Sequence, residues 1–280
     1  CAMKSSDDQG RTWSEQKIIP PLKCGATYEA RDPSPLPDLE TGEIFLMTRG
    51  PWLISSRDDG RTWSEARSLS DALPGDWTSL AAGTGNSALQ LRQGRHKGRL
   101  LTSLYGSGVI ALVLSDDHGE TWRPGALLAS NTASEPSVAE LSDGRVLVSP
   151  RHGLGRERGR LFLFSDDGGE SFSEKRYEPG IPMAGQGEIL ASEPLGLGGA
   201  RKVRPIVCCG PADNKTRLTL MASLDDGRTW PVSRVLDDGS AANLALVALP
   251  GGQVGVLYER DKYRRLSFQR VDLAALIASR

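Results

Sequence analysis

One short pattern recurs five times and constrains the fold more than any other feature of the chain. Each copy has the form Ser-x-Asp-x-Gly-x-(Thr or Ser)-aromatic, and the copies begin at Ser6, Ser56, Ser115, Ser165 and Ser223. Their first serines are 50, 59, 50 and 58 residues apart. Self-similarity at such a period is typical of repeat architectures built from one supersecondary unit. The chain is therefore predicted to be a repeat protein.

The pattern is predicted to form a turn between two strands. An Asp side chain accepts hydrogen bonds from backbone N–H groups of its own loop, and the Gly two positions later adopts positive φ without a steric clash. The Thr or Ser re-enters an extended strand, and the aromatic residue after it points into the interior. A calcium-binding loop is the alternative, but no Glu closes a twelve-residue loop, so a structural role is favoured.

Short strands and tight turns surround each copy. The turns Ser142–Gly144 and Pro250–Gly252 are of the Asp-Gly and Gly-Gly kind that join hairpin strands. Four strands in a repeat of about fifty residues indicate the blade of a β-propeller. We expect an all-β, six-bladed propeller forming a single domain over residues 1–280, with a short helix at 273–279. The first copy begins only five residues into the chain, so we expect a truncated N-terminus and an incomplete first blade.

Composition excludes several classes of function. The net charge is −1, which gives no electrostatic footprint for nucleic acid, and no run of eighteen apolar residues predicts a membrane span. No glycine-rich loop follows a strand and opens a helix, and Gly83–Ser87 is interpreted as a loop on the rim of the propeller. No cofactor is expected, and a monomer is predicted. The histidines and cysteines show no metal-ligand spacing: His96, His118, His152, Cys1, Cys24, Cys208 and Cys209.

The adjacent Cys208 and Cys209 lie in an apolar strand and are interpreted as core residues. Cysteine usage does not fix the compartment, and no leader can be identified upstream of Cys1. Secreted, periplasmic and lysosomal-type locations all stay open.

Several stretches, taken in order, resemble the exo-α-sialidases (neuraminidases), six-bladed propellers whose repeated turn is the Asp-box. The stretches are Asp32–Leu36 with Thr41–Leu46, Gly98–Leu101, Ser115–Trp122, Glu135–Arg145 and Leu249–Glu259. The resemblance runs from the first residues to about Leu273. It implies an exo-α-sialidase-type glycosidase acting on terminal sialic acids of glycoconjugates, or on a related acidic sugar.

Such a site must hold a carboxylate beside an oxocarbenium-like centre. Guanidinium groups match a carboxylate bidentately, and sialidases use Tyr as nucleophile with a neighbouring Glu as its base. By resemblance, Glu135 is that glutamate, and Arg160 and Arg217 are arginines of the carboxylate-binding triad. Asp32 would contact substrate, and Glu259 would brace the first triad arginine. Gln186, in the Gly185–Gly187 loop, is expected from its position to line the pocket. That arginine and the acid/base Asp would lie upstream of Cys1.

One position departs from the family pattern. The nucleophilic Tyr falls on Asn243, and the flanking residues align without a gap. An Asn side chain cannot form a glycosyl-enzyme through a phenolate, although it could position a water. The residues therefore leave three alternatives: a sialidase-like hydrolase with an altered mechanism, a propeller that binds acidic sugars without cleaving them, and a plain interaction propeller.

Overall fold

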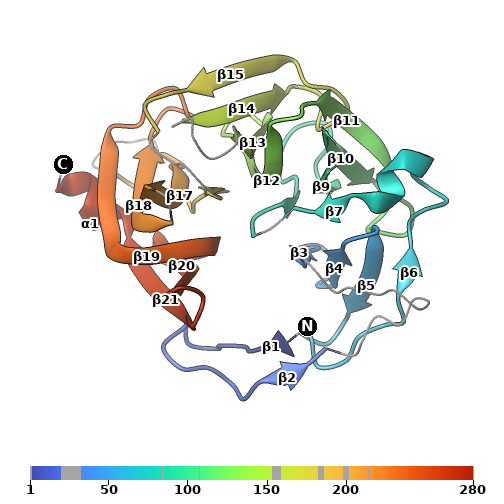
Figure 1. Cartoon of the computed structure of the whole chain (residues 1–280), viewed down its shortest axis with the longest axis horizontal. Helices are drawn as coiled ribbons and strands as arrows, with labels where there is room; N and C mark the ends of the chain where they lie inside the picture. The colour runs from blue at the N-terminus through green and yellow to red at the C-terminus, as the bar shows by residue number, and fades with distance from the viewer. Residues whose placement is uncertain are drawn as a thin grey trace.

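The computed structural model shows an all-β chain whose sheets are arranged in a ring (Figure 1). It describes residues 2–19, 33–83, 85–106, 108–152, 159–181, 186–197, 202–213 and 215–279. Asp32, Cys1 and Cys24, singled out above, lie outside these ranges. Among the described residues no helix is long and apolar enough to cross a membrane.

Three sheets have a similar plan, in which antiparallel strands follow one another in sequence order from the centre of the ring outward (Figure 1). The first contains β3 (Ser34–Pro37), β4 (Ile44–Thr48), β5 (Trp52–Ser56) and β6 (Arg67–Ser68). The second contains β7 (Ala81–Ala82), β8 (Ala88–Gln90), β9 (Leu100–Gly106), β10 (Val109–Ser115) and β11 (Arg123–Ala129), and the helical turn η1 (Gly75–Ser79) precedes it. The third contains β12 (Ala133–Glu140), β13 (Val146–His152), β14 (Arg160–Ser165) and β15 (Glu174–Glu178).

The fourth large sheet has six strands because one long strand belongs to both of its halves. The strands are β16 (Glu188–Ala191), β17 (Ile206–Asp213), β18 (Thr216–Ser223), β19 (Val232–Leu249), β20 (Gln253–Arg260) and β21 (Arg265–Asp272). The first part of β19 pairs with β18, and the part from Ala241 onward pairs with β20. A two-stranded ribbon, β1 (Ala2–Met3) with β2 (Lys17–Ile18), and the helix α1 (Leu273–Ala278) complete the described elements.

The backbone hydrogen bonds therefore do not divide the described chain into the six separate blades that the sequence predicted. Within the described ranges there are four sheets of four to six strands and one ribbon. The all-β propeller arrangement itself, the hairpin turns and the C-terminal helix agree with the sequence. Asp272 caps that helix by accepting a hydrogen bond from the Ala275 N–H at 2.9 Å.

All five repeated patterns form the predicted turn, each joining two consecutive strands that pair antiparallel. In the second copy the Ser56 hydroxyl donates to Asp58 at 2.9 Å and accepts the Gly60 N–H at 2.8 Å. Asp58 also accepts the N–H of Thr62 at 2.8 Å and its hydroxyl at 2.6 Å. Gly60 has φ +77°, as its place in the turn requires. These interactions make the turn a closed set of hydrogen bonds.

The aromatic residue of a turn packs on the preceding sheet. Trp122 lies edge-on to Phe45 of β4 with ring centroids 6.3 Å apart, and Trp230 lies 5.8 Å from Phe162 of β14. Trp13 makes the same kind of contact with Phe268 of β21, at 5.4 Å. The first turn therefore packs on the last sheet, and this contact connects the two ends of the chain.

The other side of the N-terminal ribbon packs on the first large sheet. Met3 lies against Gly60, so close that a Cβ there would be 3.1 Å from its sulfur. Ile19 is buried with Leu46 and Ile54 in one apolar cluster. The ribbon therefore bridges the last and first large sheets, and the ring is closed by side-chain packing.

We expect the turns to make the fold sensitive to acid. Hydrogen bonds from the hydroxyl and N–H of Thr62 lower the pKa of Asp58 to about 2. Because the folded pKa lies below the unfolded one, this stabilisation is present above pH 4 and is lost as the pH falls towards 2. Asp58→Asn should lower Tm by about 2–4 °C at pH 7 and should make Tm fall less steeply as the pH is lowered. Differential scanning calorimetry from pH 7 to 2.5 measures both effects. A variant whose Tm falls with pH as steeply as that of the wild type would contradict the prediction.

Closure of the ring through Trp13 and Phe268 can be measured by a double-mutant cycle. Trp13→Ala and Phe268→Ala should couple by about 0.5–1.5 kcal/mol in urea unfolding, as expected for an edge-to-face pair. Leu266, which is 70% exposed on the same strand, provides the control. Trp13→Ala combined with Leu266→Ala should show no coupling, and equal coupling in both cycles would argue against this closure.

Candidate functional site

The chain direction places the candidate residues at one end of the ring and the repeated turns at the other. Inner strand β12 runs to the turn Ser142–Gly144, where the Ser142 N–H donates to Asp226 of the fifth repeated turn at 2.9 Å. The start of an inner strand, the end of the second strand and the start of the third strand therefore lie at the opposite end. Glu135, Asn243, Glu259 and Arg217 all occupy such positions.

Three of these residues share an unusual backbone conformation. Glu135, Arg217 and Asn243 have positive φ angles of 46°, 58° and 27°. At each of them the strand register shifts, which marks a β-bulge. Positive φ is strained for residues with a Cβ, and bulges redirect side chains next to functional sites. The sequence did not predict these bulges, because Gly is the residue that usually marks a positive φ angle and none of the three residues is Gly.

Glu135 is held by an arginine that the sequence analysis did not select. Arg151, near the end of β13, places its Nη1 3.1 Å from Glu135 Oε2. The Arg151 side chain is 35% exposed and that of Glu135 is 21% exposed. The pair is thus partly open to solvent, and the guanidinium keeps hydrogen-bonding capacity for an anion. Arg151 could have been found by noting that its strand returns to the end of the ring where Glu135 lies.

Asn243 contacts the second predicted carboxylate. Its Nδ2 donates to Glu259 Oε2 at 2.7 Å. The amide carries no nucleophilic oxygen with an acidic proton, so the position cannot act as a tyrosine would. The arrangement fixes the orientation of the amide and leaves its carbonyl oxygen as a hydrogen-bond acceptor.

The structure corrects the placement of Arg160. Its side chain is fully buried, with Nη2 donating to the carbonyl oxygens of Ser149 at 2.7 Å and Gly187 at 2.8 Å. Nε donates to the Ser149 hydroxyl at 3.0 Å. A guanidinium used in this way joins β13 to the segment before β16 and offers no exposed surface to a ligand. Spacing alone could not separate Arg160 from Arg151.

Arg217 and Gln186 differ in their surroundings. The Arg217 side chain is 54% exposed, and its nitrogens lie 3.8 Å from Asp213 and 3.9 Å from Asp238. Gln186 is buried and donates to Glu188 Oε1 at 3.1 Å. Glu135 with Arg151 and Asn243 with Glu259 therefore form the two close pairs of the candidate site.

Asn86, in a loop expected on the rim, instead ties the sheets together at the centre of the ring. The Asn86 amide accepts the Leu246 N–H at 2.7 Å and donates to the Leu246 carbonyl at 2.8 Å. The Asn86 carbonyl accepts the Val138 N–H, and the Asn86 N–H donates to Glu188 at 2.8 Å. One residue thus connects inner strands β12, β16 and β19. The polarity of this residue indicated a surface loop. Its hydrogen-bond partners come from strands far away in the sequence, so the sequence pattern could not show that it is used in the interior.

Glu188 is a buried acid that sequence analysis missed. It is fully buried at the start of β16. Burial raises the pKa of its carboxyl to about 8, although hydrogen bonds from Asn86, Ser137 and Gln186 partly offset this effect. A glutamate within an apolar strand carries no signal that distinguishes a buried acid from an exposed one.

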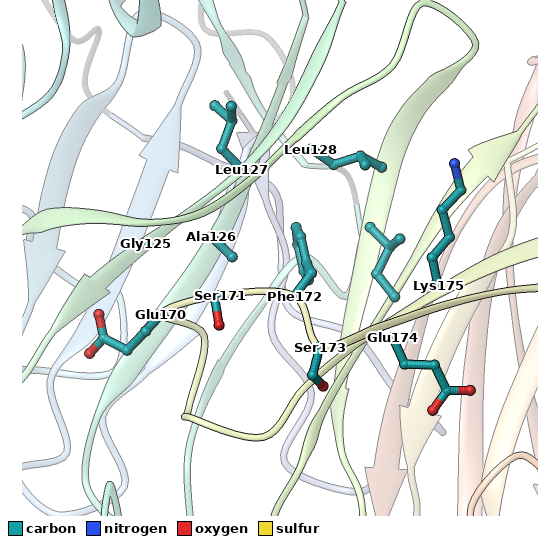
Figure 2. A pocket seen from close by; sticks show the side chains of 11 residues that line it. Gly125, Ala126, Leu127, Leu128, Glu170, Ser171, Phe172, Ser173, Glu174 and Lys175 are labelled. Atoms are coloured by element: carbon teal, nitrogen blue, oxygen red, sulfur yellow. The ribbon is translucent and has the colours of Figure 1, made fainter.

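A pocket of about 520 Å³ lies away from these residues, between β11 and the fourth repeated turn (Figure 2). Ala126, Leu128 and Phe172 contribute apolar side chains, and Glu170 and Lys175 are also among its lining residues. A second pocket occupies a similar position, between β5 and the third repeated turn. The recurrence shows that such grooves accompany the packing of one unit's turn on the previous sheet. Within the described part of the chain, no three metal-ligating side chains cluster.

Comparison with known proteins gives a consistent result. The family described as BNR repeat-like domain matches residues 2–259. A sialidase from Micromonospora viridifaciens is 34% identical over an alignment of 289 residues, which covers 91% of this chain and 44% of that enzyme. The chain thus spans less than half the length of this relative.

Solved structures show the same fold. The Hadza microbial sialidase Hz136 superposes with a TM-score of 0.80 at 25% identity, over 98% of this chain and 60% of that one. The intramolecular trans-sialidase from Ruminococcus gnavus, solved with oseltamivir carboxylate, gives a TM-score of 0.79 at 18% identity. That superposition covers 98% of this chain and 88% of the trans-sialidase. At this lower identity the likeness concerns the fold alone.

The two arginines should respond oppositely to substitution. Arg160→Met leaves buried carbonyls of Ser149 and Gly187 without their donor and should destabilise the fold by about 3 kcal/mol or more in urea unfolding. Arg151→Met removes a partly exposed ion pair and should change stability by less than about 1 kcal/mol. Similar losses of stability in the two variants would contradict these assignments.

Proposed function

Because the chain belongs to the family of BNR repeat-like domains and resembles sialidases along most of its length, we propose that it is a sialidase-like propeller acting on terminal sialic acids of glycoconjugates. The observation that carries the proposal is the gathering of Glu135, Arg151, Asn243 and Glu259 at one end of the ring. Two of these residues occupy strained bulges. Strain of this kind persists where the surrounding structure enforces a particular side-chain direction.

Arg151 takes the role of carboxylate binder that the sequence suggested for Arg160. Its guanidinium is partly exposed and lies beside Glu135, so it can approach an acidic sugar while holding the glutamate in place. A planar guanidinium binds a carboxylate through two parallel hydrogen bonds. Arg217 is exposed and supplies a second cation at the same end of the ring.

Asn243 determines what chemistry is open to the site. Without a phenol, no glycosyl-enzyme forms at this position, so hydrolysis would require direct attack by water. Glu135 is a carboxylate that could activate that water as a general base, as in inverting glycosidases. The Asn243–Glu259 hydrogen bond also fits the second candidate function, a propeller that holds sialic acid without cleaving it.

We also propose that the ring comprises six units. The long strand β19 serves as the outer strand of one unit and the inner strand of the next, which divides the six-stranded sheet in two. The ribbon β1–β2, with its own repeated turn, belongs to a sixth unit. The packing of Trp13 on Phe268 supports this count because it repeats the turn-to-sheet contact made elsewhere in the ring.

A fluorogenic sialoside tests the enzymatic proposal. Asn243→Tyr introduces a phenol at the family's nucleophile position, beside Glu259, and should raise the rate of fluorophore release at least about tenfold over the wild type. The matched control is Gln93→Tyr, which introduces the same side chain beside Leu141, next to the turn Ser142–Gly144 at the opposite end of the ring. No release from the wild type or from Asn243→Tyr, with both folded, would exclude hydrolysis of this substrate by the chain.

Sialic acid binding separates the two candidate functions. Titration calorimetry with N-acetylneuraminic acid should show saturable binding that Arg151→Met weakens about tenfold or more, as loss of a charged hydrogen-bond pair predicts. Arg145→Met, at the opposite end of the same strand, should bind like the wild type. Binding without turnover would support the non-catalytic alternative, and equal affinities in all three proteins would contradict the site.

A further inference from the structure

The carboxyl of Glu188 lies in a cradle built around it at the centre of the ring. Asn86 N–H donates to one oxygen at 2.8 Å, and the Gln186 amide donates to the other at 3.1 Å. Gly85 faces the same carboxyl so closely that a Cβ there would lie 2.4 Å from Oε1. A larger residue at 85 would collide with the acid, so the surrounding chain is shaped to hold it.

A short path of contacts leads from this acid to the candidate site. Gly187, the preceding residue, accepts a hydrogen bond from Arg160, which also donates to the carbonyl and hydroxyl oxygens of Ser149. Ser149 lies two residues before Arg151 on β13, and Arg151 pairs with Glu135. Burial lowers the pKa of the Arg160 guanidinium, and the charges of Cys208, Glu188 and Glu135 partly oppose this effect. Arg160 is therefore a buried cation that interacts electrostatically with both acids.

Two thiols of β17 lie near Glu188, and neither ionises near neutral pH. Cys209 is the partner of Glu188 in the strand register and Cys208 is its neighbour in sequence; burial raises the pKa of the Cys208 thiol to about 12 and that of the Cys209 thiol well above its ordinary value. Asn86, Gln186 and Ser137 contribute neutral hydrogen-bond donors. At pH 7 the Glu188 carboxyl is mostly protonated, since its pKa is raised to about 8.

We propose that Glu188 is a positioning residue that controls the affinity of the Glu135–Arg151 site for anionic sugars through the buried cation Arg160. When Glu188 is neutral, the positive charge of Arg160 is available to favour an anion at the site. When Glu188 ionises, its negative charge offsets that of Arg160, and binding of an anionic sugar becomes weaker. The ligand readout of this proposal rests on the proposed function, whereas the electrostatic coupling can be measured without a ligand.

The affinity for N-acetylneuraminic acid between pH 6 and pH 9.5 tests the ligand readout. The wild type should lose about fivefold in affinity as the pH passes 8, and Glu188→Gln should show a flat profile over this range. Glu140→Gln is the matched control, because Glu140 is also a buried acid that accepts backbone N–H groups but lies at the opposite end of β12. It should keep the wild-type profile. An alkaline loss that persists in Glu188→Gln would overturn the proposal.

Carboxyl-labelled glutamate NMR tests the coupling in the protein without ligand. The Glu135 carboxyl signal of the wild type should shift as the pH passes about 8, following the ionisation of Glu188. Absence of such a shift would overturn the proposal even if Glu188→Gln did not fold. If no sialic acid binds at any pH while the shift is present, the proposed function fails and the coupling stands.

Discussion

Each sheet of the ring can bury its faces only against its two neighbours, so the structure depends on the contacts between sheets. The repeated turn provides them: its Ser, Asp and Thr side chains close the turn, and its aromatic residue packs on the preceding sheet. The same contact between Trp13 and Phe268 joins the ends of the chain. In the described part of the chain the two ends of the ring are joined by side chains and share no strand, so the energy of ring closure is concentrated in a few apolar contacts.

The candidate site follows from this organisation. Because the turns occupy one end of every unit, the other end is free for residues at strand starts and bulges. Glu135 and Asn243 sit at such bulges with positive φ, and the strain is maintained by the ladders on both sides. The rigid inner strands thus fix the backbone positions of the candidate residues, and the bulges determine the direction in which their side chains point.

Charged side chains at the centre of the ring differ from those nearer its surface in burial and in hydrogen-bond partners. Arg160 is fully buried and satisfied by carbonyl oxygens, whereas Arg151 is partly exposed and paired with Glu135. Glu188 stays mostly neutral because ionisation would place a charge in an environment that solvates it poorly. The polar interior therefore joins the inner strands through hydrogen bonds of buried side chains.

The sequence by itself determined the repeated turn, the all-β class, the burial of Cys208 and Cys209 and the C-terminal helix, since each depends on local pattern and short-range hydrogen bonds. It also led to Glu135, Asn243 and Glu259, through an ordered resemblance. Tertiary structure alone decided that Arg160 is buried whereas Arg151 pairs with Glu135, and that Asn86 and Glu188 meet at the centre. Those outcomes depend on which strands become neighbours and on how much water each side chain keeps, and neither is encoded in spacing along the chain.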